Sequence, residues 1–358
     1  MQQAIEQASR GIGRTAPNPP VGAIVVSDGQ IIGRGFHPRA GEPHAEIFAL
    51  NDAGAAARGA ELYVTLEPCC HQGRTGPCTE AVISAGISKV YVGTVDPNPK
   101  VSGAGIAQLE AAGIKVVSAV LEDECRRLIA AFCKVVTAGM PQVIYKSALT
   151  LDGRTATTSG DSCWISSAES RALVHRLRDR VDAIMVGAGT VIADDPRLTT
   201  RLKEGGRDPV RVVIDGRLRT SPQAVVYTQH SLATTILITA ADQPEAALER
   251  FRECGVKIIQ VERGADGALD LVAAMRELAA LGLHSVLLEG GATLAGAMLR
   301  AGLIDRLMLF YAPKLLAGSD GPGLFAGAGV AAIADAIPLT AMTVTQVGGD
   351  ILLEGEVA

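Results

Sequence analysis

Short apolar runs separated by polar turns alternate with amphipathic segments in the first part of the chain. The runs VGAIVV (21–26) and QIIGRGF (30–36) flank the turn SDG and predict a β-hairpin. Further strands are predicted at 61–66, 89–96 and 114–120. After a polar first helix, more helices are predicted from about His44 to Ala57, from Cys78 onwards and at 105–113. The pattern therefore predicts a small mixed sheet covered by helices.

The segment LEDECRRLIAAFCKVVTAG (121–139) predicts one amphipathic helix, stopped by Gly139 and Pro141. Cys125 and Cys133 lie eight positions apart in it, so we expect them to share a helix face and to pack. After this helix the alternation of strands and helices starts again. We therefore expect a domain boundary here, with one domain at 1–140 and a second at 141–358.

The second part of the chain repeats the alternation on a larger scale. Strands are predicted at 142–149, 183–187, 211–215, 234–240, 256–261, 285–289 and 305–311, with a closing hairpin around 348–350. Helices are predicted at 168–180, 268–281 and 292–302. Alternating strands and helices place both parts in the α/β class.

Composition narrows the class of protein. Hydrophobic residues make up 48% of the 358 residues but aromatic residues only 3%, so aliphatic side chains must fill the cores, as in layered proteins with buried parallel strands. The net charge of −5 and the lack of a basic surface argue against nucleic acid as a partner. The polar start of the chain and the absence of a long apolar run predict a cytoplasmic protein without a membrane partner.

Three of the seven cysteines lie in EPCCHQGRTGPC (67–78). An odd number of cysteines in a protein expected in the cytoplasm argues against disulfides. Upstream, PHAEIFAL contains His44 and Glu46, and HxE followed by Pro–Cys is typical of zinc deaminases. Here Cys69 and Cys78 are separated by eight residues instead of the usual two. From residue types alone a catalytic zinc site is favoured, while a structural zinc site and buried cysteines without metal stay open.

The residues between the two cysteines form a polar, glycine-rich segment that carries Arg74. We expect this segment to be a loop able to touch a substrate. Cys78 opens a predicted helix, whose N-terminal amides favour a thiolate.

Two segments of the second part have the form of ligand-binding turns. SVLLEGGATLAGAML (285–299) is a strand, two glycines and a helix, an arrangement whose amides suit a phosphate, although a plain strand-to-helix turn is the commoner explanation. VGAGTVIADDPRLTTR (186–201) combines glycines, a threonine and an acidic pair, and its alternative is a surface loop with helix caps. We expect the remaining histidines to be core or surface residues: His37, His175, His230 and His284.

Several longer motifs then add a family resemblance. HAE, TLEPCCHQGRTGPC, APNPPVGAIVV and DPNP in the first part resemble the bifunctional riboflavin-biosynthesis deaminase/reductase family, as do LDGRTA, GDSCW, ADDPRLT, EGGATLAG and YAPKLL in the second. The resemblance implies a cytidine-deaminase-like three-layer α/β/α domain, followed by a dihydrofolate-reductase-like α/β domain. It also implies hydrolytic deamination of 2,5-diamino-6-ribosylamino-4(3H)-pyrimidinone 5′-phosphate, then NADPH-dependent reduction of the ribosyl group to ribityl.

Carried over by motif, the resemblance makes His44, Cys69 and Cys78 the Zn²⁺ ligands and Glu46 the catalytic proton carrier. Cys70 and His71 are then not ligands. Cys70 stands where this family usually has serine, which adds an alternative thiol beside the metal. The chain also begins within the family's first helix, so we expect a short helix there.

In the second domain the resemblance implies NADPH contacts and substrate contacts. The NADPH positions are Ala148, Trp164, Thr190, Asp194, Gly216, Gly291, Ala292, Thr293, Leu294, Ala295, Gly296 and Ala297. The substrate positions are Ser162, Arg178, Leu198, Arg201 and Glu289. Gly216 stands where the family often has serine, so we expect a backbone contact only. Lys146 either lies near the sugar and helps proton transfer, or it forms a structural salt bridge with Asp152.

The sequence leaves two alternatives to this function. One is a zinc deaminase of another base with an accessory nucleotide-binding domain, and the ligand spacing argues against it. The other is a non-catalytic zinc and nucleotide-binding protein, which has no need for Glu46. A homo-oligomer, formed through the reductase domain, is a further expectation.

Overall fold

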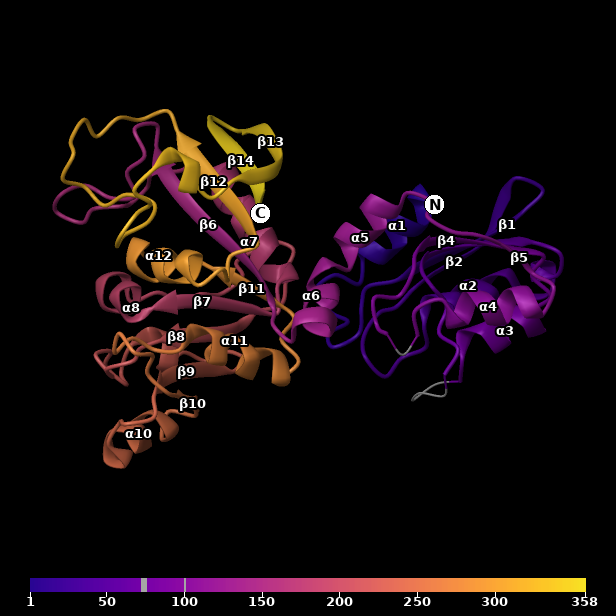
Figure 1. Cartoon of the computed structure of the whole chain (residues 1–358), viewed down its shortest axis with the longest axis horizontal. Coiled ribbons are helices and arrows are strands. Elements are labelled where there is room, and N and C mark those ends of the chain that lie inside the picture. Colours follow the sequence, from indigo (N-terminus) through magenta and orange to yellow (C-terminus); the bar gives the residue numbers. More distant parts are fainter. Residues whose placement is uncertain (72–75, 100) are drawn as a thin grey trace. The chain divides into compact units, whose positions relative to one another are not determined.

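The computed structural model describes residues 1–71, 76–99 and 101–358, and the chain divides into two compact units, Met1–Met140 and Pro141–Ala358 (Figure 1). Unit 1 contains a five-stranded sheet in the order β2-β1-β3-β4-β5. β1 is antiparallel to β2 and β3, and β3, β4 and β5 are parallel. The strands are β1 (Gly22–Ser27), β2 (Gln30–Phe36), β3 (Glu61–Leu66), β4 (Lys89–Thr94) and β5 (Lys115–Val117). The helices are α1 (Gln2–Ser9), α2 (Ala45–Ala53), α3 (Cys78–Ser84), α4 (Ala104–Ala111), α5 (Glu122–Leu128) and α6 (Ala130–Ala138), with a short 3₁₀ turn at Gly54–Ala57.

Helices cover both faces of this sheet. Gly35 faces α2, because a Cβ atom added there would lie 2.1 Å from the Ala45 carbonyl oxygen. Gly22 faces α1, because its added Cβ would lie 2.0 Å from the Ala4 carbonyl oxygen. Gly35 pairs with Ala23, the neighbour of Gly22, and successive residues of a strand point to opposite faces. α1 and α2 therefore lie on opposite faces, which confirms the three-layer arrangement.

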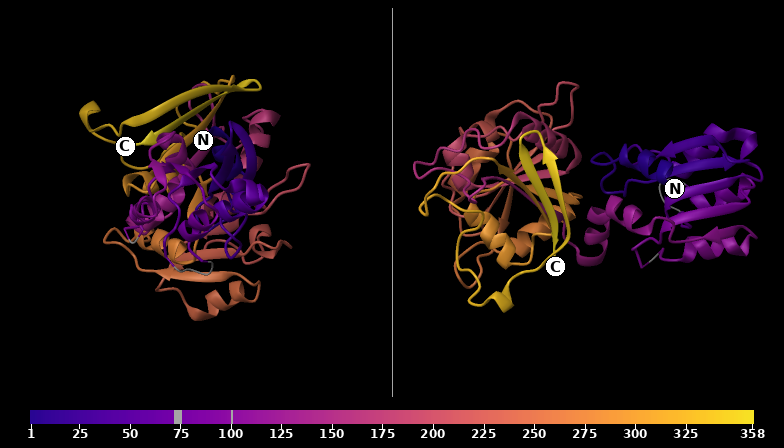
Figure 2. Two further views of the ribbon diagram at one scale, coloured as in Figure 1. Left: turned by 90° about the vertical axis from the view of Figure 1, so that its right-hand side faces the viewer. Right: turned by 90° about the horizontal axis from the view of Figure 1, so that it is seen from above.

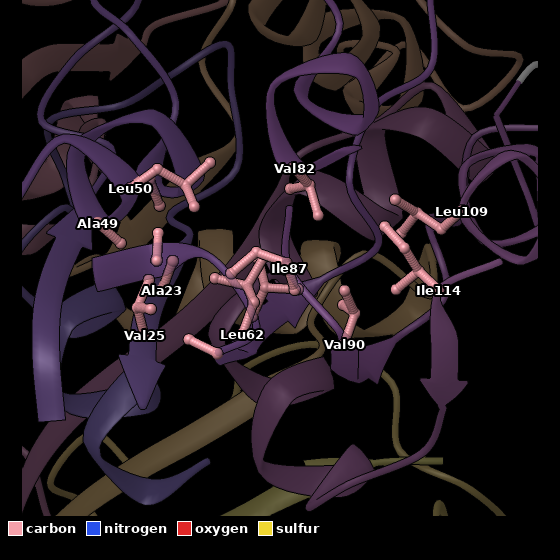
Figure 3. Packing of buried hydrophobic residues seen from close by; sticks show 14 of the residues in the cluster. Ala23, Val25, Ala49, Leu50, Leu62, Val82, Ile87, Val90, Leu109 and Ile114 are labelled. Carbon is pink, nitrogen blue, oxygen red and sulfur yellow. The ribbon is translucent and has the colours of Figure 1, made fainter. Parts of the chain in front are cut away.

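The core of unit 1 lies between the sheet and the layer of α2, α3 and α4. Leu62 and Val90 of the central strands belong to one apolar cluster with Leu50, Val82 and Leu109 of those helices (Figure 3). All of these side chains are at most 8% exposed. This apolar layer fixes the first turns of α2 and α3 above the ends of the strands.

The prediction of a single helix at 121–139 is wrong, because the structure has two helices there, α5 and α6. They meet at Ile129, whose φ of −104° and ψ of 12° interrupt the helical backbone. Ile129 is 1% exposed, so its burial decides the local conformation over helix propensity. Cys125 is buried in α5 and Cys133 is half-buried in α6, so the two cysteines do not share one helix face.

Unit 2 contains a nine-stranded sheet in the order β10-β9-β8-β7-β11-β6-β12-β14-β13. The strands from β10 to β12 in this order are parallel, and β14 and β13 add an antiparallel hairpin (Figure 2). The strands are β6 (Gln142–Thr150), β7 (Ala183–Gly187), β8 (Val210–Ile214), β9 (Thr235–Ala240), β10 (Lys257–Val261), β11 (Ser285–Leu288), β12 (Arg306–Ala312), β13 (Leu339–Val347) and β14 (Asp350–Val357). The helices are α7 (Ala168–Arg180), α8 (Ala188–Asp194), α9 (Val225–Thr228), α10 (Glu245–Arg252), α11 (Leu271–Ala280) and α12 (Ala292–Arg300), with a 3₁₀ turn at Ile333–Asp335.

Parallel strands bring their carboxyl ends to one edge of the sheet. Ala148 lies near the end of β6, and Glu289 directly follows β11. Gly216 follows β8 by two residues, and α8 with Thr190 begins where β7 ends. Ligands of open α/β sheets bind at this edge, so the topology gathers the expected reductase positions there. Within the described residues, no helix combines the length and apolar character needed to cross a membrane.

Candidate active sites

His44, Cys69 and Cys78 come together from three elements of unit 1. His44 is the N-cap residue of α2, Cys78 is the first residue of α3, and Cys69 lies in the segment after β3. The His44 Nδ1 atom lies 3.2 Å from the Cys78 Sγ and 3.5 Å from the Cys69 Sγ. One nitrogen and two sulfur atoms within 4.8 Å of one another suit Zn²⁺ and leave a fourth position open.

Hydrogen bonding shifts the pKa values of the two thiols in opposite directions. The bond with Cys78 lowers the pKa of Cys69 to about 4, and His44 adds to this effect. The same bond and burial raise the pKa of Cys78. The backbone N–H of Cys78 also donates to the Cys69 Sγ at 3.4 Å. Cys69 is therefore held as the thiolate, the form that binds a metal.

Glu46 lies in the first turn of α2 and is 3% exposed. Its Oε2 atom is buried and has no hydrogen-bond partner among the residues that the structure describes. Burial raises the pKa of Glu46 to about 7, although the His44 imidazole opposes the shift. A carboxyl group with this pKa and a free oxygen beside the His–Cys–Cys group suits proton transfer at neutral pH.

A cavity of about 470 Å³ opens over these residues. His44, Glu46 and Cys69 line it, together with residues from α6 and from the loops around it. These further lining residues include Pro17, Asn18, His37, Glu67, His71, Asp96, Asn98, Val101 and Phe132. The cavity is large enough for a substituted pyrimidine and offers both polar and apolar walls. Arg74, expected to touch a substrate, lies outside the described residues.

His37 has a more specific position than a core or surface histidine. It is 2% exposed and lines the cavity, with its ring centroid 5.3 Å from that of His44. Its Nδ1 atom lies 3.0 Å from the Pro43 carbonyl oxygen, and its Nε2 atom lies 3.0 Å from the Asn18 amide nitrogen. A carbonyl oxygen only accepts, so Nδ1 donates and Nε2 accepts from Asn18. The motifs APNPP and DPNP were the sequence signals for Asn18 and Asn98, whereas nothing in the sequence pointed to His37 or Phe132.

In unit 2, Arg178 and Glu289 form a buried bidentate pair. The Arg178 Nε and Nη2 atoms donate to the two Glu289 carboxylate oxygens at 2.8 and 2.9 Å. The Lys146 Nζ atom lies 3.9 Å from the same carboxylate. Burial alone would raise the pKa of Glu289, but Arg178 and then Lys146 lower it to about 2. Two cations around one anion leave a net positive charge, which suits a phosphorylated sugar.

Of the two interpretations of Lys146 and Asp152, the structural salt bridge between them is wrong, because Lys146 pairs with Glu289. The Asp152 carboxylate instead accepts hydrogen bonds from the Thr150 hydroxyl and from the backbone N–H groups of Leu316 and Ala317. Asp152 therefore anchors the segment after β12.

His175, expected in the core or on the surface, accepts a hydrogen bond at Nδ1 from the Arg201 backbone at 3.3 Å. Burial and then Arg178 and Arg201 lower its pKa to about 4, so it is neutral at pH 7. The structure thus adds a neutral imidazole beside the expected substrate arginines.

The expected NADPH turn lies at the start of α12. Gly291 is its N-cap residue, and its N–H donates to the Thr190 hydroxyl at 3.2 Å. Ala292, Thr293, Leu294 and Ala297 belong to the first turns of this helix, while Ala295 and Gly296 are buried. Gly296 packs against the chain, since an added Cβ would lie 2.1 Å from the Ala326 carbonyl oxygen.

The other expected positions lie on several segments of unit 2. Trp164 is 65% exposed, with the Arg171 guanidinium 4.7 Å from its ring centroid. The Gly216 carbonyl oxygen accepts a hydrogen bond from Arg263 at 2.8 Å. Leu198 is buried and has a φ of 56°. Ser162 is half-buried, and Asp194 and Arg201 are exposed.

Together, the layered fold and the His–Cys–Cys–Glu arrangement define unit 1 as a zinc deaminase of the cytidine-deaminase class. A family model described as the cytidine and deoxycytidylate deaminase zinc-binding region matches residues 1–94. A second, described as the RibD C-terminal domain, matches residues 141–353.

Two riboflavin biosynthesis proteins RibD, from Bacillus amyloliquefaciens and Escherichia coli (strain K12), are each 42% identical to the chain. Their matches cover 99% of this chain and 94% and 97% of those proteins. The structure of Acinetobacter baumannii RibD matches with a TM-score of 0.88 at 39% identity, over 100% of this chain and 97% of that one. A Thermotoga maritima structure, described as a diaminohydroxyphosphoribosylaminopyrimidine deaminase/5-amino-6-(5-phosphoribosylamino)uracil reductase, matches with a TM-score of 0.86 at 38% identity, with the same coverage.

The chain belongs to the RibD family. It is a bifunctional enzyme of riboflavin biosynthesis, with a zinc-dependent deaminase domain followed by an NADPH-dependent reductase domain. The second unit is thus a RibD reductase domain, and the alternative of an accessory domain of another kind is excluded.

Proposed function

We propose that unit 1 hydrolyses the C2 amino group of 2,5-diamino-6-ribosylamino-4(3H)-pyrimidinone 5′-phosphate, and that unit 2 then reduces the ribosyl group of the product. The observation that carries the first step is the free, buried Glu46 Oε2 beside His44, Cys69 and Cys78. The donor set of one imidazole and two thiols fits zinc, and the carboxyl group beside it has no structural use for its free oxygen.

In the proposed deamination, His44, Cys69 and Cys78 hold zinc, which when bound supplies a Lewis acid that lowers the pKa of water. Glu46 takes a proton from the attacking water, because its pKa of about 7 lets it accept and release protons at neutral pH. The water oxygen forms a bond to C2, and the C2–N bond breaks. Glu46 returns its proton to the leaving amino group, which departs as ammonia.

In the proposed reduction, the C1′–O4′ bond of the ribosyl ring breaks, O4′ takes a proton from water, and NADPH when bound would supply a hydride to C1′. The Thr190–Gly291 contact and the first turn of α12 form the cofactor edge of this site. Lys146, Arg178 and Glu289 form its charged floor, and Arg178 donates two hydrogen bonds to Glu289 and one to the Thr199 carbonyl oxygen. The domain mainly holds the two reactants close together in the correct orientation, and Lys146 is placed to hydrogen-bond the sugar.

The test is ammonia release from the diaminopyrimidinone ribosylamine phosphate by zinc-loaded protein without NADPH. We expect one ammonia to be released per substrate while NADPH is absent. When NADPH is then added, we expect it to be consumed, and we expect little activity with NADH in its place. No ammonia from a fully metallated sample would mean that another base is the substrate.

We further propose that two copies of the chain associate through β13 of the reductase unit. β13 is an edge strand of nine residues. Its first eight residues are exposed, and Leu339, Met342 and Val344 add apolar surface. A long, exposed, apolar edge strand is a template for pairing with a second strand. The proposed location of this assembly is the cytoplasm.

Light scattering tests the association. We expect a dimer or larger oligomer for the unchanged chain and a monomer for Val344→Lys. Leu232→Lys is the control, because Leu232 is a fully exposed apolar residue far along the chain from β13. A monomeric unchanged chain would overturn the proposal.

A further inference from the structure

Glu67 follows β3 directly and lies two residues before Cys69. It is 3% exposed although it lines the cavity. Its carboxylate accepts four backbone N–H bonds, from Asp96 (3.1 Å), Gly103 (2.9 Å), Gly105 (2.9 Å) and Ile106 (3.2 Å). Two carboxylate oxygens offer about four lone-pair sites, so these bonds leave no acceptor site for a substrate.

The four bonds join two parts of unit 1. The Oε2 atom binds Asp96 and Gly103, which stand at the two ends of the loop between β4 and α4. The Oε1 atom binds the first turn of α4 through Gly105 and Ile106. Within the loop, Asp96 Oδ1 accepts the Asn98 N–H at 2.8 Å. Asp96 and Asn98 both line the cavity, so Glu67 fixes one of its walls.

The helix α4, which Glu67 also binds, is packed against the segment that carries the metal ligand Cys69. A Cβ atom added at Gly105 would lie 2.0 Å from the Pro68 carbonyl oxygen. The Thr79 hydroxyl lies 3.3 Å from the Cys69 carbonyl oxygen and 2.7 Å from the Gln108 side-chain oxygen. α4 and the segment that carries Cys69 therefore have little room to move apart.

We propose that Glu67 is a positioning residue for the deamination. It holds the Asp96–Asn98 wall at a fixed place relative to the metal ligands, and so sets how tightly the pyrimidine substrate binds. It acts through the loop and does not touch the reacting atoms. This inference rests on the proposed deamination in the same cavity.

Glu67→Gln tests it, because an amide replaces one acceptor oxygen by an NH₂ group that faces two N–H donors. We expect KM for the pyrimidine to rise about tenfold while kcat changes less than about threefold, since uniform binding is lost and the proton carrier is untouched. Zinc content and reductase activity should stay unchanged. Glu110→Gln, on the exposed last turn of α4, is the matched control and should leave KM unchanged.

Glu67→Asp keeps the charge on a shorter side chain, so its KM should lie between those of the unchanged chain and Glu67→Gln. If Glu67→Gln does not fold, the KM of Glu67→Asp decides. An unchanged KM with a lower melting temperature would show a purely structural role and overturn the inference. Absence of ammonia release from the unchanged chain would instead overturn the proposed deamination itself.

Discussion

At the scale of single residues, the chemistry of unit 1 depends on one buried carboxyl group with an oxygen atom that no described residue binds. Glu46 Oε2 is unpartnered within the described part of the chain, and burial holds the pKa of the group near 7. The cost of burying an unpartnered polar atom is acceptable where the atom has a task in catalysis.

Glu46→Gln keeps the shape of the side chain but removes its ability to carry a proton. We expect kcat for ammonia release to fall by about 10³-fold, since general acid–base catalysis contributes about 10²- to 10⁴-fold. Zinc content, measured by atomic absorption, should stay at the level of the unchanged chain, as should reductase activity. Glu80→Gln on the exposed surface of α3 is the control. Zinc loss with intact ammonia release would contradict the assignment.

The buried Arg178–Glu289 pair gives a prediction of stability. Glu289→Gln removes the carboxylate that pairs with Arg178 and Lys146, and breaking a buried pair in this way costs about 3–5 kcal/mol. Urea unfolding followed by circular dichroism measures the change. Glu245→Gln breaks a pair with Arg252 whose Glu245 side chain is 73% exposed, and it should change the free energy of unfolding by less than about 1 kcal/mol. Equal effects of the two substitutions would contradict the buried pair.

The same pair makes the stability of unit 2 sensitive to acid. The folded-state pKa of Glu289 is about 2, below the ordinary glutamate value of about 4.3. A depressed carboxyl pKa gives stability that is fully present above the ordinary value and is lost as the pH falls toward the folded value. Between about pH 4.5 and pH 2, Glu289→Gln should therefore lose less stability than the unchanged chain. Parallel pH profiles for the two proteins would rule this out.

At the scale of elements, the metal ligands depend on how closely α2 lies against the sheet. Gly35→Ala adds a Cβ that would meet the Ala45 carbonyl oxygen, one residue after His44. Overpacking of this kind costs about 1–3 kcal/mol, and here it displaces the helix turn that carries His44 and Glu46. We expect weaker zinc binding in competition with a chelator, while reductase activity serves as the internal control. Unchanged zinc affinity would show that α2 can shift without moving its first turn.

Most elements could be predicted because their signals are local. α7 begins and ends as predicted, since Ser167 caps it with a hydrogen bond from the Ser170 N–H. The break at Ile129 could not be predicted, because it follows from tertiary burial of an apolar residue within an apolar helix pattern. The helix α8 was not predicted, because the glycines at 187 and 189 are also typical of a loop, and α10 was not predicted either.

The metal site could be predicted because a motif records it, although His44 and Cys78 lie 34 positions apart. The roles of other residues depend on partners that no local motif names. Glu67 binds amides 29 to 39 positions away, and Arg178 binds a carboxylate 111 positions away. His37 was missed for the same reason, since a single imidazole carries no spacing signal.

At the scale of the whole molecule, each proposed activity is confined to one unit. A mixture of Glu46→Gln and Lys146→Met chains should therefore convert the diaminopyrimidinone to the ribityl product, although neither chain does so alone. Chromatography of the product measures this, and each single variant is the control for the other. If the mixture stays inactive while both remaining single activities are normal, the intermediate does not pass between chains.

The separate cores of the two units have a consequence for the history of such a chain. Among the described residues, the apolar cluster beneath α2, α3 and α4 is built from unit 1, and the clusters around Val213 and around Phe310 are built from unit 2. A substitution that repacks one core thus imposes no compensating change on the other. Each half can diverge, duplicate or join a different neighbour at its own pace, and Met140–Pro141 is the natural point at which genes for two such enzymes could be fused or parted.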